Sequence, residues 1–318
     1  MTGTLVYILA SQTIFDAATP EADRIRHLTN GFIIAASAML LLVIALTAYM
    51  CIQYRARPGQ PEPPQVHVNR QVEMWMVGIP LLMVIGFFFW SVRTMSAILP
   101  DNGSQPPDVI ITGHQWWWEA TYPGKHVTTA NEIHVPAGKK LLLQLTSADV
   151  IHDWWVPALG GKMDMLPGKR THLWLTIRQP GVYEGACSEF CGQQHAWMRI
   201  KVIAHTLPDY NRWLQQHAAP AAAPQSALAA RGARIFMEST CSSCHRIKGT
   251  AANGMAGPDL THFAARQTML AGMLPNDTVH VYQFISDPQT VKPGAHMPRF
   301  IFEPDSLRAL TAYLTQLK

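Results

Sequence analysis

Two long runs of apolar residues stand out in the first third of the chain. Residues 31–54 and residues 74–92 contain no charged side chain, and the runs are 24 and 19 residues long. Each run is therefore long enough to cross a bilayer as a helix. The glycines and the proline of the second run would weaken a soluble helix, but a membrane helix tolerates them. The pattern predicts a transmembrane helical hairpin over residues 31–99, and the alternative is a buried hairpin of a soluble protein.

The charges around the two runs predict the orientation of the hairpin. Arg55, Arg57 and Arg70 lie in the loop between the runs, and arginines favour the cytoplasmic side of a membrane. Residues 1–30 and the rest of the chain are then extracytoplasmic. Residues 5–9 are apolar but lack a positively charged region before them, so they do not predict a signal peptide.

The middle of the chain, residues 100–205, has the pattern of short β-strands. Leu141, Leu143 and Leu145 recur at every second position, and Pro-Gly pairs mark turns before and after them. Several short strands at this spacing favour a sandwich or a barrel. Alanine and proline without apolar periodicity then predict a linker over residues 206–226, which leaves residues 227–318 as a further domain.

The composition agrees with a membrane-spanning region and argues against nucleic acid as a partner. Among 318 residues, 48% are hydrophobic and only 14% are charged, which is low for a soluble protein. This length predicts two or three domains. The net charge of +4 is modest and no basic tract is present, so we expect membrane lipid rather than nucleic acid as a partner.

The densest candidate chemistry lies in residues 187–198. This stretch holds two thiols, an imidazole, a thioether and a carboxylate, and a further histidine lies upstream in an aromatic run: Cys187, Glu189, Cys191, His195, Met198 and His152. Sulfur and imidazole are ligands suited to copper, whereas magnesium and calcium prefer oxygen. Two cysteines, two histidines and a methionine could hold a pair of copper ions that share both sulfurs.

Three other interpretations of this stretch remain open. The two cysteines could form a disulfide if the domain is extracytoplasmic. Together with His152 and His195 they could instead form a tetrahedral zinc site, although zinc has no use for Met198 or Glu189. A sulfur-rich core loop is the third interpretation. The spacing could also follow one face of a helix, but the glycines in and before the stretch favour a loop.

A second redox motif lies in the last domain. Cys241-Ser-Ser-Cys244-His245 is the attachment sequence of a c-type haem, with a zinc or redox Cys-x-x-Cys-His as the alternative. The sixth iron ligand should be a methionine, because His/Met ligation suits electron transfer. The candidates are Met255, Met269, Met273 and Met297.

Among these methionines we favour Met297, because its Met-Pro pair on a late loop resembles the pattern of class I cytochromes c. Met269 and Met273 lie in a segment of helical pattern and are expected in the core. His296 is adjacent to Met297 but points to the opposite side of an extended chain. A first helix at residues 230–236 is expected to pack against a last one at residues 307–317.

The stretch at residues 187–198 resembles the dinuclear copper loop of cytochrome c oxidase subunit II, Cys-Ser-Glu-x-Cys-Gly-x-x-His-x-x-Met. Every fixed position of that pattern is present. The run from His152 through Pro167-Gly168 and the run Gly113-His-Gln-Trp-Trp-Trp118 also resemble this family, and Met-Pro at Met297 and the loop at residues 257–261 resemble its fused cytochromes. The resemblance covers roughly residues 30–318.

The resemblance implies a multi-domain membrane protein with a two-helix transmembrane hairpin, a cupredoxin-like β-sandwich and an all-α class I cytochrome c domain. It implies a dinuclear copper (CuA) centre held by the side chains of His152, Cys187, Cys191, His195 and Met198. Glu189 would add its backbone carbonyl and offer its carboxylate to a magnesium ion shared with subunit I. A haem c would be held by Cys241, Cys244, His245 and Met297.

Two further residues take roles from the resemblance. Trp116, the first of three tryptophans, corresponds to the point where electrons enter, although such a triplet can also serve only packing. Glu73 lies seven residues before Pro80, as does the glutamate at the mouth of a proton path into subunit I. The neighbouring Glu-Met-Trp departs from the family pattern, and a carboxylate that reaches the membrane interface is the alternative. His114 is expected to be structural.

The function implied is that of subunit II of a cytochrome c oxidase. Electrons would pass from haem c to the copper pair and on to haem in subunit I, where oxygen is reduced to water in aerobic respiration. The expected partners are subunits I and III and an electron donor such as a cytochrome c or a quinol-oxidising complex. The expected place is the inner (plasma) membrane, crossed twice, with both redox domains on the periplasmic side.

Proteins of other classes fit less well. A membrane-anchored electron carrier outside any oxidase could use the same two centres, and co-purification with a large multi-span subunit would distinguish it. A quinol oxidase subunit of this fold lacks the copper ligands that are complete here. Nitrous oxide reductase shares the copper motif but needs a large catalytic domain for which no sequence remains.

Overall fold

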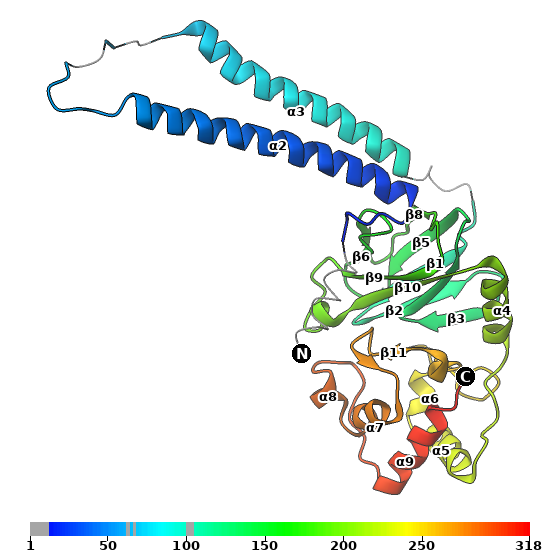
Figure 1. Cartoon of the computed structure of the whole chain (residues 1–318). Coiled ribbons are helices and arrows are strands. Elements are labelled where there is room, and N and C mark those ends of the chain that lie inside the picture. Colours follow the sequence, from blue (N-terminus) through cyan, green and yellow to red (C-terminus); the bar gives the residue numbers. More distant parts are fainter. Residues whose placement is uncertain (1–12, 62–63, 66–67, 100–104) are drawn as a thin grey trace. The chain divides into compact units, whose positions relative to one another are not determined.

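The computed structural model of the chain describes residues 13–61, 64–65, 68–99 and 105–318, drawn in colour in Figure 1. The apolar residues 5–9 considered above lie outside the described residues. Residues 23–99 form one compact unit, and the other described residues form a second. The second unit contains both redox domains, and each unit is described by itself.

The helical unit is the predicted hairpin. Helices α2 (Pro20–Gln53) and α3 (Arg70–Ile98) lie side by side and antiparallel (Figure 1). Both are long and apolar enough to cross a membrane, and their apolar windows are not buried within the structure. Gly31 permits their contact, because a Cβ atom there would lie 2.6 Å from the ring of Trp90. Such unburied apolar length indicates a membrane anchor rather than a soluble hairpin.

Polar residues outside the apolar runs set where these helices begin. The Thr19 hydroxyl accepts a hydrogen bond from the backbone N–H of Ala22, so α2 begins well before the uncharged run. The side chain of Asn69 caps α3 in the same way through the N–H of Val72. Glu73 lies in the first turn of α3, as the sequence indicates.

The middle of the chain forms a β-sandwich of two five-stranded sheets, with strand orders β3-β2-β1-β5-β8 and β4-β10-β9-β6-β7. The strands are β1 (Val109–His114), β2 (Trp117–Tyr122), β3 (Val127–Ala130), β4 (Glu132–Pro136), β5 (Leu141–Ser147), β6 (His152–Trp155), β7 (Met163–Met165), β8 (Thr171–Leu175), β9 (Gly181–Cys187) and β10 (Arg199–His205). Strands β1 and β5 pair in parallel, as do β4 and β10, while the other pairs are antiparallel. The cupredoxin-like sandwich predicted for this region is thereby confirmed.

Strand β5 departs from the simple alternation that its sequence predicts. Leu143 and Leu145 are fully buried, as expected for residues that face the core. However, Leu142 and Gln144 on the other face are also buried, at 5% and 8% exposure. The reason is that β5 lies inside its sheet between β1 and β8, where neighbouring side chains cover the outer face as well.

Helix α4 (Leu207–Ala218) follows the sandwich and leads to the last domain. Its buried Trp213 stacks against His134 of β4 and against His217, with ring centroids 4.3 and 4.4 Å away. The chain after α4 then lies along the last domain, since the N–H of Ala221 donates to the carbonyl of Lys248. The linker is therefore packed, and it does not act as a free tether over this part.

The last domain is α-helical, as predicted for a class I cytochrome c. Its elements are α5 (Ala227–Glu238), α6 (Cys241–Cys244), the 3-10 turn η2 (Phe263–Ala265), α7 (Thr278–Ser286), α8 (Pro288–Val291), α9 (Pro304–Leu314) and a short ribbon of β11 (Thr268–Met269) and β12 (Leu274–Pro275). The first and last of these helices pack together, as expected. A Cβ atom at Gly232 would lie 1.9 Å from the carbonyl oxygen of Ala309, and the rings of Phe236 and Tyr313 are 5.9 Å apart.

One local prediction in this domain is wrong. Met269 and Met273 do not lie in a helix, because Met269 ends β11 and Met273 lies in the turn that follows. Leu270, Ala271 and Gly272 in this turn have φ values of 56°, 59° and 79°, which reverse the chain within a few residues. Met269 is nevertheless buried at 5% exposure, so its expected place in the core is confirmed.

Candidate metal and haem centres

The loop of residues 187–198 joins two neighbouring strands of the sandwich. Cys187 ends β9 and Met198 directly precedes β10, and these strands are paired. The N–H of Cys187 donates to the carbonyl of Met198 and closes the base of the loop. His195 begins a 3-10 turn, η1 (His195–Trp197), after Gly192, whose φ of 113° favours glycine. The stretch is therefore a loop, as the glycines indicate, and not a continuous helix.

The distant histidine reaches this loop through the sheet. His152 begins β6, and β6 pairs with β9 so that Trp154 lies opposite Cys187. The imidazole of His152 is fully buried. It fits against Gly113, where a Cβ atom would lie 2.8 Å from the ring. Strand pairing therefore brings together residues that are 35 positions apart in the chain.

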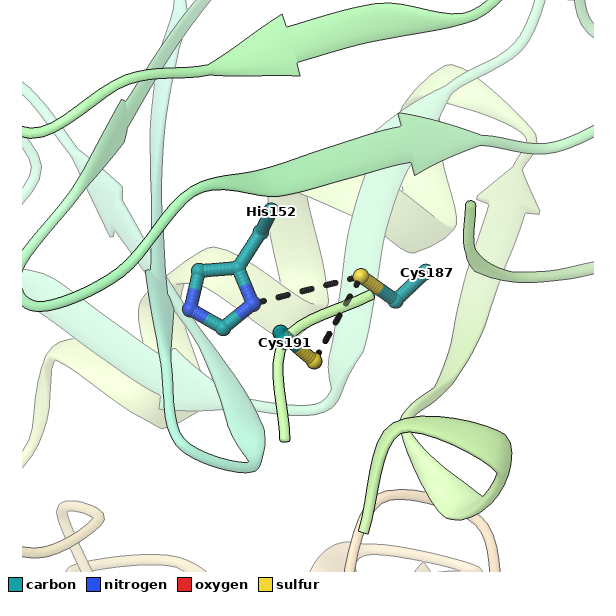
Figure 2. Close-up of side chains that lie close together, drawn as sticks. All are labelled: His152, Cys187 and Cys191. Atoms are coloured by element: carbon teal, nitrogen blue, oxygen red, sulfur yellow. Dashed lines mark hydrogen bonds between the residues drawn. The ribbon is translucent and has the colours of Figure 1, made fainter. Parts of the chain in front are cut away.

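The sulfur and nitrogen atoms of these residues converge in a small space, part of which is shown in Figure 2. The two Sγ atoms of Cys187 and Cys191 are 3.8 Å apart, and Cys187 Sγ lies 3.9 Å from His152 Nδ1. Cys191 Sγ lies 3.6 Å from His195 Nδ1 and 3.7 Å from Met198 Sδ. All five side chains named by the sequence therefore lie at one place, and His152, Cys187 and Cys191 are buried together.

These distances discriminate among the interpretations of the loop. A disulfide needs sulfurs about 2.05 Å apart, and both cysteines here are free thiols. Metal–sulfur bonds of about 2.3 Å at tetrahedral angles place two sulfurs roughly 3.8 Å apart, which is the spacing observed. The thioether of Met198 adds a soft ligand that zinc sites do not use. The donor set therefore fits copper.

Glu189 contacts the cluster through its backbone. Its carbonyl oxygen lies 3.2 Å from Cys187 Sγ, at the border of the cluster. The residue is otherwise exposed, as is its neighbour Phe190. This arrangement leaves the carboxylate available to a second site outside the copper cluster.

Asp149 is a functional residue that the sequence reasoning missed. Its carboxylate lies 2.8 Å from Nε2 of His152, which orients the ring and turns Nδ1 toward Cys187. Burial alone would lower the pKa of His152, but the bond to Asp149 raises it above its ordinary value. Burial would likewise raise the pKa of Asp149, yet its bonds to His152 and to the N–H groups of Gln115 and Val150 lower it. An acidic residue three positions before a ligand histidine was the available signal.

The pKa values of the two cysteine thiols are shifted in opposite directions. The Cys191 thiol, together with the bond to His152, holds the pKa of Cys187 well below its usual range. The Cys187 sulfur, together with burial, raises the pKa of Cys191. Two buried sulfurs this close cannot both carry a full charge without a cation between them, so the pair favours a bound metal.

Two side chains from the tryptophan-rich segment contact the loop at one atom. The carbonyl oxygen of Cys191 accepts hydrogen bonds from Nε2 of Gln115 at 2.8 Å and from Nε1 of Trp116 at 2.9 Å. Trp116 is buried at 7% exposure. Gln115 had no role in the sequence prediction, and the electron-entry role that the resemblance gives Trp116 stays a prediction. His114 stacks on Trp117 with ring centroids 4.1 Å apart, which agrees with a structural role.

The two cysteines of the Cys-x-x-Cys-His motif lie in a short helix, and the histidine follows it. Cys241 and Cys244 bound α6, both thiols are free and half-buried, and His245 follows. Nδ1 of His245 lies 2.8 Å from the carbonyl oxygen of Pro258, which fixes the ring and leaves Nε2 for a metal. Gly257 provides room, because a Cβ atom there would lie 2.5 Å from the ring. These residues fit a covalently attached haem.

Met297 lies on the loop after α8 and is half-buried. Its carbonyl accepts a hydrogen bond from Nε2 of Gln289 at 3.0 Å. Met255, another candidate, is 77% exposed, and Met269 is committed to the core. Among the described residues, no contact joins the Met297 side chain to His245, so its assignment as a haem ligand stays a prediction.

Comparisons with known proteins agree with this geometry. Residues 124–205 match the family of cytochrome c oxidase subunit II periplasmic domains, and residues 229–318 match the cytochrome c family. Cytochrome c oxidase subunit 2 of Alkalihalophilus pseudofirmus is 34% identical over 316 residues, covering 96% of this chain and 91% of that protein. The same subunit of Bacillus sp. PS3 is 29% identical, covering 83% and 80% of the two chains.

A solved structure is also similar to part of this chain. It is the periplasmic domain of subunit II of cytochrome oxidase from Bradyrhizobium japonicum, with 30% identity and a TM-score of 0.34. The match covers 36% of this chain and 96% of that one.

A sulfur-rich metal loop on a β-sandwich, joined to a haem-binding domain and a membrane hairpin, defines a membrane-anchored electron-transfer subunit. The chain belongs to the cytochrome c oxidase subunit II family. Its copper domain carries a dinuclear copper centre, its cytochrome c domain carries a haem, and its electrons pass to subunit I, where oxygen is reduced. The hairpin indicates a membrane anchor and the copper domain lies on the extracytoplasmic side.

Proposed function

We propose that this chain receives electrons at the haem of its last domain and passes them to the copper pair through the surroundings of Trp116. The observation that carries the proposal is the convergence of the five ligand side chains at sulfur distances of 3.6–3.9 Å. His152, Cys187, Cys191, His195 and Met198 would hold the copper pair, together with the carbonyl of Glu189. A copper pair held by these residues would supply a one-electron redox centre, and a rigid ligand set would keep its bond lengths nearly constant during transfer.

The chain's own residues hold this site rigid. Asp149 fixes the ring of His152, while Gln115 and Trp116 fix the carbonyl of Cys191. The indole of Trp116 therefore touches the copper loop directly, which suits it to be the point where electrons enter. In the last domain, Cys241 and Cys244 would attach the haem, and His245 and Met297 would ligate its iron, a pair that raises the haem potential.

The test of this proposal is the metal content of the purified subunit. We expect about two coppers for each haem iron and a spin shared by both coppers in electron paramagnetic resonance, because both thiolates bridge the pair. Zinc in place of copper, or a spin confined to one copper, would contradict the ligand assignment.

We further propose that the Glu189 carboxylate binds a magnesium ion at the border with subunit I. Its exposure beside the copper loop supports this. Glu189→Gln should remove about one magnesium ion from the oxidase complex and leave the copper signal intact, since copper would use only the carbonyl. Metal analysis of the complex measures both. Glu238→Gln, exposed on α5, is the control, and magnesium retained in the Glu189 variant would contradict the site.

Glu73 is proposed as the mouth of a proton path into subunit I. Its place in the first turn of α3, beside the predicted membrane surface, supports this role. Glu73→Gln should slow proton uptake by the turning-over complex without changing the copper or haem spectra. Unchanged uptake would mean that the carboxylate only reaches the membrane interface.

The remaining partners and the orientation complete the proposal. The arginines between α2 and α3 support a cytoplasmic loop, so both redox domains would face the periplasm at the inner (plasma) membrane. Subunit III would join the complex, and a cytochrome c or a quinol-oxidising complex would donate the electrons. Co-purification of this chain without a large multi-span subunit would instead favour a carrier outside an oxidase.

A further inference from the structure

A buried lysine of the cytochrome domain reaches the tryptophan that touches the copper loop. Lys292 ends α8 and is only 4% exposed. Its Nζ donates to the carbonyl oxygen of Trp116 at 2.9 Å and to that of Leu270 at 3.2 Å. The lysine therefore joins three segments: its own loop, the turn after β11 and the tryptophan-rich segment of the copper domain.

The charge of Lys292 has no partner of opposite sign within salt-bridge distance among the described residues. Burial lowers the pKa of this ammonium group to about 8. Burial of a charge without a carboxylate is costly, and an apolar side chain of similar length would fill the same space at lower cost. Stability alone therefore does not explain a lysine here, whereas a need for two directed hydrogen bonds does.

The same loop makes further contacts with the copper loop. Nε2 of Gln194 donates to the carbonyl of Pro293 at 2.6 Å. Gly294 lies against Gln193, since a Cβ atom there would lie 2.3 Å from Oε1 of that glutamine. His296 follows, and its ring centroid is 5.4 Å from that of Trp116. The loop that carries Met297 thus lies directly on the loop that carries the copper ligands.

One exposed residue, Gln289, connects these contacts to Met297. Gln289 of α8 accepts from the N–H of Gly294 at 3.0 Å and donates to the carbonyls of Ala295 and Met297 at 2.8 and 3.0 Å. The loop of residues 292–297 is therefore braced as one piece. A shift of Lys292 relative to Trp116 would carry Met297 with it.

We propose that Lys292 is a positioning residue, which holds the loop of residues 292–297 on Trp116 and so sets the separation and orientation of the two redox centres. The inference rests on the proposed function, because it takes Trp116 and Met297 in the roles given above. Lys292 neither ligates a metal nor carries the electron. Its role is to fix the geometry of the electron transfer.

The test compares Lys292→Met with the parent in the complete oxidase. The rate of electron transfer from haem c to copper after flash reduction should fall about ten- to a hundredfold, because small misplacements of reacting groups slow a reaction by about this much. The haem absorption and the copper resonance should stay unchanged, because no ligand is altered. Lys292→Gln keeps a hydrogen-bond donor and should recover part of the rate. Lys125→Met, at an exposed site of the sandwich, is the control for loss of one charge.

A second readout does not depend on turnover. A spin label at Val279→Cys, a 62% exposed position on α7, reports its distance to the copper spin in a Cys51→Ser background. The distance distribution should be narrow in the parent and in Lys292→Gln, and broad in Lys292→Met. A narrow distribution and an unchanged rate in Lys292→Met would overturn the inference. If that result is obtained and Trp116→Phe still slows the transfer, the proposed function stands although the inference about Lys292 is wrong.

Discussion

Cys191→Ser is expected to abolish the mixed-valence copper signal while the haem is retained. The Cys191 sulfur lies within 3.8 Å of Cys187 Sγ, His195 Nδ1 and Met198 Sδ, so its loss removes contacts to three other ligand atoms. A serine hydroxyl stays protonated near neutral pH and is a hard ligand, so it cannot replace a bridging thiolate. Electron transfer to subunit I should fall by more than about a hundredfold, beyond the loss typical of outer-shell changes.

The measurement for this variant is electron paramagnetic resonance together with copper and iron analysis. Cys51→Ser provides a matched control, because Cys51 is exposed on α2 and lies far along the chain from the copper loop. Loss of haem together with copper would mean that the variant fails to fold. An intact two-copper signal in Cys191→Ser would refute the assignment of this ligand.

Trp116→Phe is expected to slow electron transfer between the two domains about ten- to a hundredfold while both centres keep their spectra. Phenylalanine lacks the Nε1–H that donates to the Cys191 carbonyl, and it is too short to fill the space beside His296. The copper ligands themselves are unchanged by this substitution. The effect should therefore appear in the transfer rate and leave the copper resonance as it is.

Trp174→Phe is the matched control for this change. Trp174 lies in β8 under the ammonium group of Lys140, away from the contacts that join the two domains. It should transfer electrons at the parent rate. An unchanged rate in Trp116→Phe as well would show that electrons reach the copper loop by another route.

The sequence predicted the convergence of the candidate ligands because most of them lie in one short loop between paired strands. The positions of Cys187 and Met198 at the two ends of that loop are fixed by β9 and β10, so spacing in sequence translates directly into proximity. His152 was a candidate ligand from the chemistry of its side chain, but its approach to the loop depends on the pairing of β6 with β9. Spacing alone does not predict which strands pair.

The residues that surround the ligands were harder to predict. Asp149 and Gln115 are common polar residues whose roles depend on where their side chains point, and no motif records this. Lys292 and Trp116 are 176 positions apart, so nothing in the local sequence of either indicates their contact. Such a contact forms only when two folded domains pack together, so a local motif cannot predict it.

Local patterns also failed where the environment overrode them. Leu142 and Gln144 of β5 are buried because β5 lies within its sheet, which the alternating pattern does not record. Met269 was expected in a helix, but three consecutive residues of positive φ turn the chain there. Two of those residues, Leu270 and Ala271, rarely adopt this conformation, so propensity predicts the wrong element.

The central claim is that one chain carries electrons from its haem to its own copper pair. The most direct test is flash reduction of the haem in the purified oxidase, with haem and copper absorbance followed together. We predict a single phase in which the haem loses as many electrons as the copper pair and the haem of subunit I together gain, at a rate independent of protein concentration. A rate proportional to protein concentration, or a haem that stays reduced while copper stays oxidised, would contradict the account.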